Sequence, residues 1–350
     1  MAARRWTHRP EGSNWGDFGP DDQLGRLNLV TREKLLQGLA EAVEGIAFCL
    51  SRPLDYPGGS DLNPRRKPPI LRPTLREGQV NFNATLGPDS GSSDVFCDDL
   101  AILHLQYSTQ WDALAHVGGQ FDVDGDGELE HVFYNGFRAG TEIVGPGSVD
   151  DAGIGSAMKP ESTSKAGALG IENMAAHGIQ GRAVMIDLHA HLGDAHTQVG
   201  YDILMPILEQ DKVVVEQGDM VCLHTGFAQV VLDMGRTPDP ERLHNSCAVL
   251  DGRDGRLLNW ITDSGLAALI ADNYAVEAHP ARPCDRDCCS TLPLHEHCLF
   301  KNGIPLGELW HLTPLAAWLR ENGRNRFLLT APPLRLPGAV GSPVTPVATV

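Results

Sequence analysis

A short apolar run that leads directly into a group of polar side chains is the feature that most constrains the fold of this chain. Residues 100–105 are apolar and have the length of one buried strand. Residues 106–116 follow at once, and Gln110, Asp112 and His116 bring an amide, a carboxylate and an imidazole within seven residues. Because a rigid element positions the loop that follows it, the sequence predicts a functional site at this point.

Asp112 and His116 are four residues apart. If residues 111–117 form a helical turn, both side chains lie on one face. They then form a general base with its orienting partner, or two ligands of one metal ion. The alternative is that Asp112 caps a short helix and His116 is a surface or core histidine. This stretch by itself leaves the two interpretations equally open.

The stretch resembles the signature of the cyclase family, which includes bacterial arylformamidases (kynurenine formamidases) and isatin hydrolases. The family pattern is His-x-Gly-Thr-His-x-Asp-x-Pro-x-His, and this chain keeps Thr109, Asp112 and His116. It departs from the pattern at four positions, which are Gln106, Ser108, Gln110 and Leu114. The chain is therefore similar to a branch that reads Thr-Gln-Trp-Asp, in which glutamines replace the two motif histidines.

Further matches to the family follow in order along most of the chain. They include residues 15–29, 133–136, 271–277, 294–308 and 333–344. The resemblance implies one α/β domain over residues 1–350 with the cyclase-like (swivelling β/β/α) fold. It implies a mixed central sheet flanked by helices, preceded by an N-terminal arm at residues 1–30.

The resemblance also implies a site. Its catalytic residues are expected to be Asp112, His116, His295 and Glu308, although His297 competes with His295 for the same role. Its substrate-binding residues are expected to be Thr109, Gln110, Trp111, Phe133 and Tyr134. The candidate metal ligands are Gln106, Gln110, Asp112, His295 and Glu308.

In the family, a metal ion polarises an amide or ester carbonyl and activates the water that attacks it. Amide oxygens are hard and neutral ligands, so the two glutamines favour manganese over zinc. The alternative is that no metal binds and the amides donate hydrogen bonds to a developing oxyanion.

Three functions remain open from the sequence. The first is a hydrolase that opens a C–N or C–O bond of a cyclic amide, lactone or aryl amide. The second is a metal-free cyclase or dehydratase of polyketide type, and the third is a binding protein without catalysis.

Composition restricts the classes of molecule that the protein is expected to bind. The formal net charge of −17 argues against nucleic acid, whose phosphates require clustered Lys and Arg, and against anionic membranes. No apolar run approaches the ~20 residues of a membrane span. No signal peptide is evident, so a cytoplasmic location is expected, with the eight cysteines as free thiols. A small-molecule substrate is expected, and the resemblance implies a homo-dimer or homo-tetramer.

Three other motifs match known metal-binding patterns only in part. The acidic turn at residues 122–127 lacks the final glutamate of an EF-hand loop, so a solvated turn is favoured over a calcium site. The pair His189 and His191 resembles a metal-binding strand end, but too few residues follow for a (β/α)₈ barrel, and pocket or surface roles are preferred. Cys284 and Cys288 form only half of a zinc motif, so unbound thiols are favoured.

Periodicity predicts the main elements. Helices are expected at residues 32–43, with Thr31 as cap, and at 171–177, 201–210 and 257–272. Strands are expected at residues 45–51, 183–188 and 220–224. Residues 55–78 and 238–254 are expected to be long loops. No Gly-x-Ser-x-Gly elbow, P-loop or dinucleotide fingerprint is present.

Overall fold

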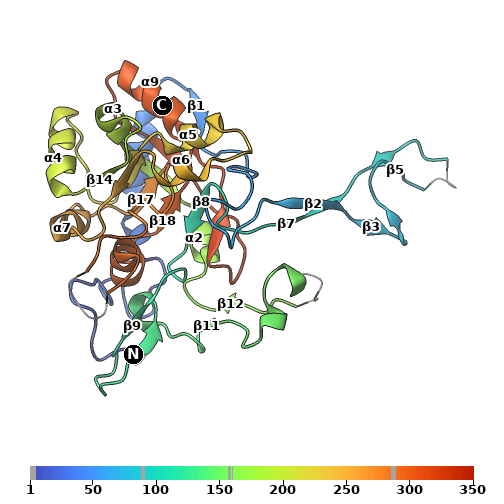
Figure 1. The fold of residues 1–350 in the computed structure, drawn as a ribbon, viewed down its shortest axis with the longest axis horizontal. Coiled ribbons are helices and arrows are strands. Elements are labelled where there is room, and N and C mark those ends of the chain that lie inside the picture. Colours follow the sequence, from blue (N-terminus) through green and yellow to red (C-terminus); the bar gives the residue numbers. More distant parts are fainter. Residues whose placement is uncertain (1–4, 88–90, 157–158, 160, 285–288) are drawn as a thin grey trace.

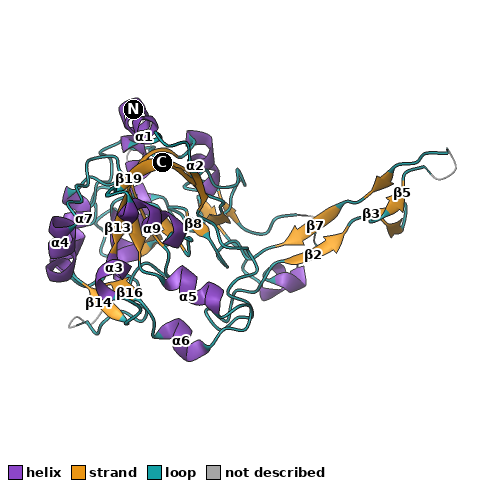
Figure 2. Ribbon diagram, turned by 90° about the horizontal axis from the view of Figure 1, so that it is seen from above, coloured by secondary structure: helices purple, strands orange, loops and turns teal. Residues whose placement is uncertain are grey.

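A mixed sheet of nine strands runs through the computed structural model, which describes residues 5–87, 91–156, 159, 161–284 and 289–350. The sheet is curled into a half-barrel (Figure 2). Its order is β1 (Ala47–Cys49), β21 (Val347–Thr349), β19 (Arg326–Thr330), β13 (Gln180–Asp187), β15 (Met220–His224), β17 (Ala268–Ala271), β18 (Leu306–Glu308), β8 (Gln110–Asp112) and β20 (Gly341–Pro343). Strands β13, β15, β17 and β18 are parallel, and the other neighbours are antiparallel. The predicted α/β class with a mixed central sheet is confirmed.

The helices cover both faces of this sheet (Figure 1). They are α1 (Arg32–Glu41), α2 (Ile171–His177), α3 (Leu188–Leu192), α4 (Tyr201–Gln210), α5 (Phe227–Asp233), α6 (Pro240–His244), α7 (Gly255–Asp263), α8 (Pro293–His295) and α9 (Thr313–Glu321). Strand side chains alternate between the faces, so Val184 and Ile186 of β13 enter one core while Ala183 and Met185 enter the other. Helices α4 and α7 contribute to the first core, and α2 and α9 to the second.

A long hairpin arm leaves the body at the β8 side of the sheet (Figures 1 and 2). It consists of β2 (Ile70–Pro73) paired with β7 (Asp99–Ile102), β3 (Leu75–Arg76) with β4 (Gln79–Val80), and β5 (Ala84–Thr85) with β6 (Val95–Phe96). Residues 100–105 were expected to form a buried strand, and that prediction is wrong because β7 belongs to this exposed arm. Three other pairs are small and local: β9 (Gly119–Phe121) with β10 (Glu130–Val132), β11 (Ile143–Val144) with β12 (Lys165–Ala166), and β14 (Thr197–Val199) with β16 (Ala248–Leu250).

Most of the predicted elements agree with the structure. Thr31 caps α1, and the elements expected at 171–177, 201–210 and 220–224 form as predicted. The helix expected at 257–272 is wrong, because it ends at Asp263 and residues 268–271 form the buried strand β17. The loop expected at 238–254 contains α6 and β16. Within the N-terminal region, Trp15 is buried and its indole N–H donates to the carbonyl of Phe300, so this part packs into the body.

Among the residues described, no helix is both long and apolar enough to cross a bilayer.

Candidate active site

Two neighbouring strands place the acidic side chains of the site. In the antiparallel pair of β8 and β18, Gln110 lies opposite Glu308, and Asp112 lies two residues further along β8. Residues two apart on a strand face the same side, so Gln110, Asp112 and Glu308 share one face of the sheet. All three are buried. The cross-strand register therefore brings together two carboxylates that are 196 positions apart in sequence.

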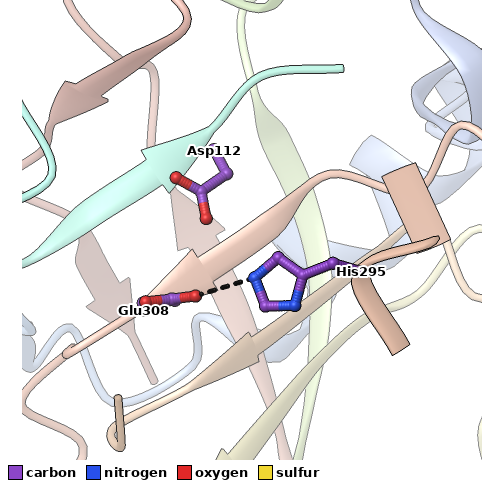
Figure 3. A group of neighbouring side chains, drawn as sticks. All are labelled: Asp112, His295 and Glu308. Carbon is purple, nitrogen blue, oxygen red and sulfur yellow. Dashed lines mark hydrogen bonds and ion pairs between the residues drawn. The ribbon is translucent and has the colours of Figure 1, made fainter. Parts of the chain in front are cut away.

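His295 reaches this face from the end of α8, where the chain continues into the π-helix Glu296–Lys301. Its Nε2 lies 3.2 Å from Oε1 of Glu308 (Figure 3). Its Nδ1 lies 2.8 Å from Oε1 of Glu277, which also accepts the backbone N–H of His295. A carboxylate on one ring nitrogen fixes the imidazole so that the other nitrogen points into the site.

The structure distinguishes the two histidines that competed for this place. His297 points away from the carboxylates, and its Nε2 lies 2.9 Å from the hydroxyl of Thr262. Burial lowers the pKa of His297 to about 4. His295 is therefore the histidine of the site. Glu277 was not predicted as a site residue, although it ends the segment 271–277 that matches the family, and that match is its signal in the sequence.

Burial and the charges of neighbouring groups compete in setting the pKa values of the three side chains. It raises the pKa of Asp112, an effect that the charge of Glu308 reinforces. Burial also acts to raise the pKa of Glu308, but the hydrogen bond and charge of His295 outweigh it and hold that pKa below its usual range. Burial acts to lower the pKa of His295, yet the bonds to Glu277 and Glu308 raise it to about 10. Positive charge at the centre therefore stabilises the group.

The amide of Gln110 fits its surroundings in two orientations. In one, its Nε2 lies 3.3 Å from Asp112 and 3.4 Å from Glu308, which are long hydrogen bonds. In the other, the nitrogen donates to the backbone carbonyls of Gln106 at 2.6 Å and Ser108 at 3.2 Å. That second orientation has the shorter bond and turns the amide oxygen toward the two carboxylates.

The resulting donor set fits a divalent cation. One ligand atom each from Asp112, His295 and Glu308 lies within 4.8 Å of the others. Oδ2 of Asp112 is buried without a hydrogen-bond partner in the described chain. With the amide oxygen of Gln110 added, three oxygens and one imidazole nitrogen converge, and such oxygen-rich sets suit hard cations.

The other predicted motif residues divide between the site and its surroundings. Nε2 of His116 lies 3.8 Å from Asp112, and its side chain is partly exposed. The predicted helical turn is wrong, because Asp112 ends β8 and the chain then turns, with the His116 N–H donating to Ala113. Gln106 packs its side chain against Gly341 of β20 and offers its backbone carbonyl to the site.

The remaining predicted substrate-binding residues play other parts in the structure. The hydroxyl of Thr109 donates to the carbonyl of Leu309, which joins β8 to the residue after Glu308. Trp111 faces the opposite core, where it stacks edge-on against Trp310. Tyr134 is buried in the first core, and Phe133 packs against it.

A pocket opens beside the carboxylates. It is lined by Asn63, Arg66, Gln106, Tyr107, Tyr274 and Leu309, together with Pro57, Gly59, Ser60 and Leu62. Arg66 donates from Nη1 to the carbonyl of Gln106, and its charge acts on both Asp112 and Glu308. The side-chain amide of Asn63 donates to the hydroxyl of Tyr274. The pocket thus combines a guanidinium, a phenol and an amide with apolar walls.

The histidine pair and the acidic turn lie apart from this pocket. His189 and His191 lie on the partly exposed helix α3, and they pair with Asp194 and Asp211, respectively. In the acidic turn, Asp122, Asp124 and Glu130 lie close together, but Arg138 already pairs with Glu130 and contacts Asp124.

The cysteine cluster differs from its prediction. Cys284 and Cys289 form a disulfide, so the prediction of free thiols is wrong for these two residues. Cys288 lies outside the described residues.

Comparison with known proteins shows the family to which the chain belongs. A family model described as "Putative cyclase" matches residues 73–278, and the chain belongs to this cyclase family. A crystal structure of a novel cyclase is 29% identical, covers 97% of each chain and has a TM-score of 0.70.

Two more distant structures share the fold. Isatin hydrolase A from Labrenzia aggregata, bound to benzyl benzoate, is 13% identical with a TM-score of 0.54, covering 91% of this chain and 98% of the other. Isatin hydrolase A from Ralstonia solanacearum is 14% identical with a TM-score of 0.53, covering 90% and 95%. No functionally curated protein matches this chain.

Proposed function

We propose that this protein is a hydrolase that opens a C–N or C–O bond of a small cyclic amide, lactone or aryl amide by attack of an activated water. The observation that carries the proposal is the buried group of Asp112, His295 and Glu308, whose ligand atoms converge within 4.8 Å. Membership of the cyclase family and the fold shared with isatin hydrolases support a hydrolytic reaction.

A divalent cation held by Asp112, His295, Glu308 and the oxygen of Gln110 would supply Lewis-acid polarisation of the substrate carbonyl and a more acidic water. Glu277 keeps the His295 ring in the orientation that this binding needs, through its bond to Nδ1. His116 lies at the edge of the group, 3.8 Å from Asp112, and is partly exposed. That position suits a residue that carries a proton to the leaving group.

The pocket supplies binding and orientation. Arg66 and Tyr274 offer hydrogen-bond donors to polar groups of the substrate, while Leu62 and Leu309 pack against its apolar part.

The other orientation of Gln110 favours a second candidate. There its Nε2 bridges Asp112 and Glu308, occupying the centre with a neutral donor instead of a cation. The site would then perform metal-free acid–base chemistry, such as the cyclisation or dehydration of a polyketide-like substrate.

Metal analysis of the purified full chain separates the two candidates. We expect about one manganese or other divalent ion per chain, bound by this single site, and its loss in Asp112→Asn. Asp122→Asn is the matched control, because Asp122 belongs to another acidic group found among the described residues and its replacement should leave the ion in place. Hydrolysis of cyclic amides, lactones and aryl formamides should fall at least ~100-fold in Asp112→Asn.

Absence of metal in the wild type, after manganese and zinc have been offered back, would overturn the metal-assisted hydrolase. Retention of hydrolysis in that metal-free protein would keep the hydrolase and assign its catalysis to acid–base groups without a metal, whereas loss of hydrolysis with cyclisation or dehydration of a polyketide-like substrate would support the second candidate. If Asp122→Asn loses the ion and Asp112→Asn keeps it, the site has been misplaced.

A further inference from the structure

Three basic residues stand together at the pocket of an otherwise acidic chain. Arg65, Arg66 and Lys67 form its longest run of adjacent basic residues, although the formal net charge is −17. Arg65 and Lys67 are exposed, while Arg66 is partly buried and lines the pocket. A local positive charge attracts anions even on a protein of negative net charge. The pocket therefore offers a positive charge to its ligand.

The guanidinium of Arg66 keeps donors that the protein does not use. Its Nη1 donates to the backbone carbonyl of Gln106 at 2.7 Å, and no carboxylate among the described residues lies within ion-pair distance of it. Of the described residues that line the pocket, none is acidic and Arg66 is the one with a charge. An arginine carries five N–H donors in a planar fork that matches the two oxygens of a carboxylate. The remaining donors favour a ligand with such a pair of oxygens.

The hydroxyl of Tyr274 offers one more donor to the same pocket. Its oxygen accepts a hydrogen bond from Nδ2 of Asn63 at 3.0 Å. Oδ1 of that amide accepts the backbone N–H of Arg65 at 3.1 Å, which fixes the amide orientation because a backbone N–H can only donate. The phenol oxygen of Tyr274 is therefore an acceptor in this contact, and its own hydrogen is left to donate to a ligand.

Tyr107 lines the same pocket but has no hydrogen to offer. Its hydroxyl donates to the carbonyl of Gly59 at 3.0 Å. Burial raises the pKa of Tyr107 to about 12, and burial together with the charge of Glu308 raises the pKa of Tyr274. Both phenols thus keep their hydrogens at neutral pH, and of the two only the hydrogen of Tyr274 is available to a ligand.

The backbone after Tyr274 fixes its place beside the carboxylates of the site. Ala275 and Val276 have φ angles of 67° and 59°, a left-handed conformation that strains residues other than glycine. The backbone N–H of Ala275 hydrogen-bonds Glu308 and helps to lower the pKa of that carboxyl. Because the next residue along this segment contacts Glu308, a ligand held by Tyr274 lies next to the candidate metal-binding group.

We propose that the pocket selects an anionic ligand, a small organic carboxylate whose oxygens accept hydrogen bonds from the Arg66 guanidinium and the Tyr274 hydroxyl. The apolar part of this ligand packs against Leu62 and Leu309. The inference rests on the proposed function in one respect, because it takes this pocket to be the substrate site. The substrate is then a carboxylic acid that also carries the bond to be opened, and its carboxylate anchors that bond toward the buried group.

Binding of benzoate and of its neutral counterpart benzamide to the full chain, measured by calorimetry, tests the proposal without any need for hydrolysis. We expect the wild type to bind benzoate at least ~10-fold more tightly than benzamide. Arg66→Gln should bind benzoate ~10–100-fold more weakly and lose the preference, because it removes hydrogen bonds between charged groups. Arg66→Lys keeps the charge without the fork and should lie between the two. Tyr274→Phe should weaken benzoate binding by ~3–10-fold.

Arg65→Gln is the matched control, because it removes the neighbouring charge of the same basic run at an exposed position. Its affinity for benzoate should stay within ~2-fold of wild type, since solvent and salt screen an exposed charge. Each titration is repeated after a chelator has removed metal, because a carboxylate can also bind a metal ion directly. Far-ultraviolet circular dichroism checks that every variant is folded.

Equal affinity of the wild type for the two probes would overturn the proposal, as would no binding of benzoate at millimolar concentration. A preference that Arg66→Gln retains, or that disappears when metal is removed, would also overturn it. A chain that prefers benzoate through Arg66 but hydrolyses no cyclic amide, lactone or aryl formamide would keep this anion site and overturn the proposed hydrolase. Hydrolysis without any preference for the anion would keep the hydrolase and overturn the anion site.

Discussion

Glu277 shows how a residue that was not predicted for the site positions one that was, His295. Its two oxygens accept three hydrogen bonds, from Nδ1 of His295 and from the backbone N–H groups of Leu294 and His295. The imidazole is therefore held at both its backbone and its ring. A ligand oriented in advance loses less entropy when it binds, so this carboxylate acts on the site through His295.

Replacing Glu277 with Gln should weaken metal binding by ~10–100-fold, because the amide holds the His295 ring less firmly and makes it less basic. Titration of the metal-free protein with manganese, followed by calorimetry, measures the change. Glu296→Gln is the control, since Glu296 is one residue from His295 but pairs with Lys301 away from the site. Equal affinity in Glu277→Gln and wild type would contradict this role.

Helix α1 shows that the packing of an element can differ from its apolar pattern. Its leucines predict a buried stripe, yet Leu36 and Leu39 are 51% and 49% exposed, while Lys34 and Gly38 are buried. Gly38 lies against β13, where an added Cβ would come within 2.7 Å of the backbone of Gly181. The close approach of helix and strand, rather than the leucine stripe, determines which face is buried.

Gly38→Ala should therefore destabilise the fold by ~1–3 kcal/mol through overpacking. This predicted change in stability is opposite in sign to the effect of helix propensity, which favours Ala over Gly by ~1 kcal/mol. Equilibrium denaturation in urea measures the difference. Gln37→Ala, on the exposed side of the same helix, should be neutral or slightly stabilising, and a stabilised Gly38→Ala variant would show that the contact is not tight.

At the scale of the whole molecule, a network of charges joins distant elements. Glu216 pairs with Lys34 of α1, Arg182 of β13 and Arg326 of β19. The hydrogen bond and charge of Arg182 lower the pKa of Glu216 below its ordinary 4.5, against the opposing effect of burial. Because the group is partly exposed, solvent screening limits its contribution to stability.

The sign of the pH dependence follows from this lowered pKa. The unfolded chain binds the proton more tightly, so the contribution of Glu216 is present above pH 4.5 and is lost as the pH falls through the lower folded value. Glu216→Gln should then cost ~0–1 kcal/mol at neutral pH, and the difference from wild type should close in acid. Thermal unfolding of the wild type and Glu216→Gln, measured from neutral to acid pH, tests this prediction, and Glu209→Gln at an exposed position is the control. A gap that widens in acid would refute the assignment.

Local patterns determined much of the fold before any tertiary contact was known. The cap Thr31, the helices at 171–177 and 201–210 and the strand at 220–224 follow from turn residues and periodicity, which act over a few neighbours. The ordered motifs also determined the family and drew attention to Asp112 and Glu308. The prediction of one helix over residues 257–272 was wrong, because a short apolar run is compatible with both helix and strand periodicity. Only the pairing with β15 and β18 determines that residues 268–271 form the strand β17.

The tertiary structure alone decided the geometry of the site. Nothing local to Asp112 indicates that Glu308 lies beside it, since that neighbourhood depends on strand register. Likewise, nothing local to the two histidines indicates that Glu277 orients His295 rather than His297. The same holds for the apolar run at residues 100–105, whose composition suits a core strand. Burial is a property of what packs against a segment, and the chain carries this one outward on an arm instead of into the sheet.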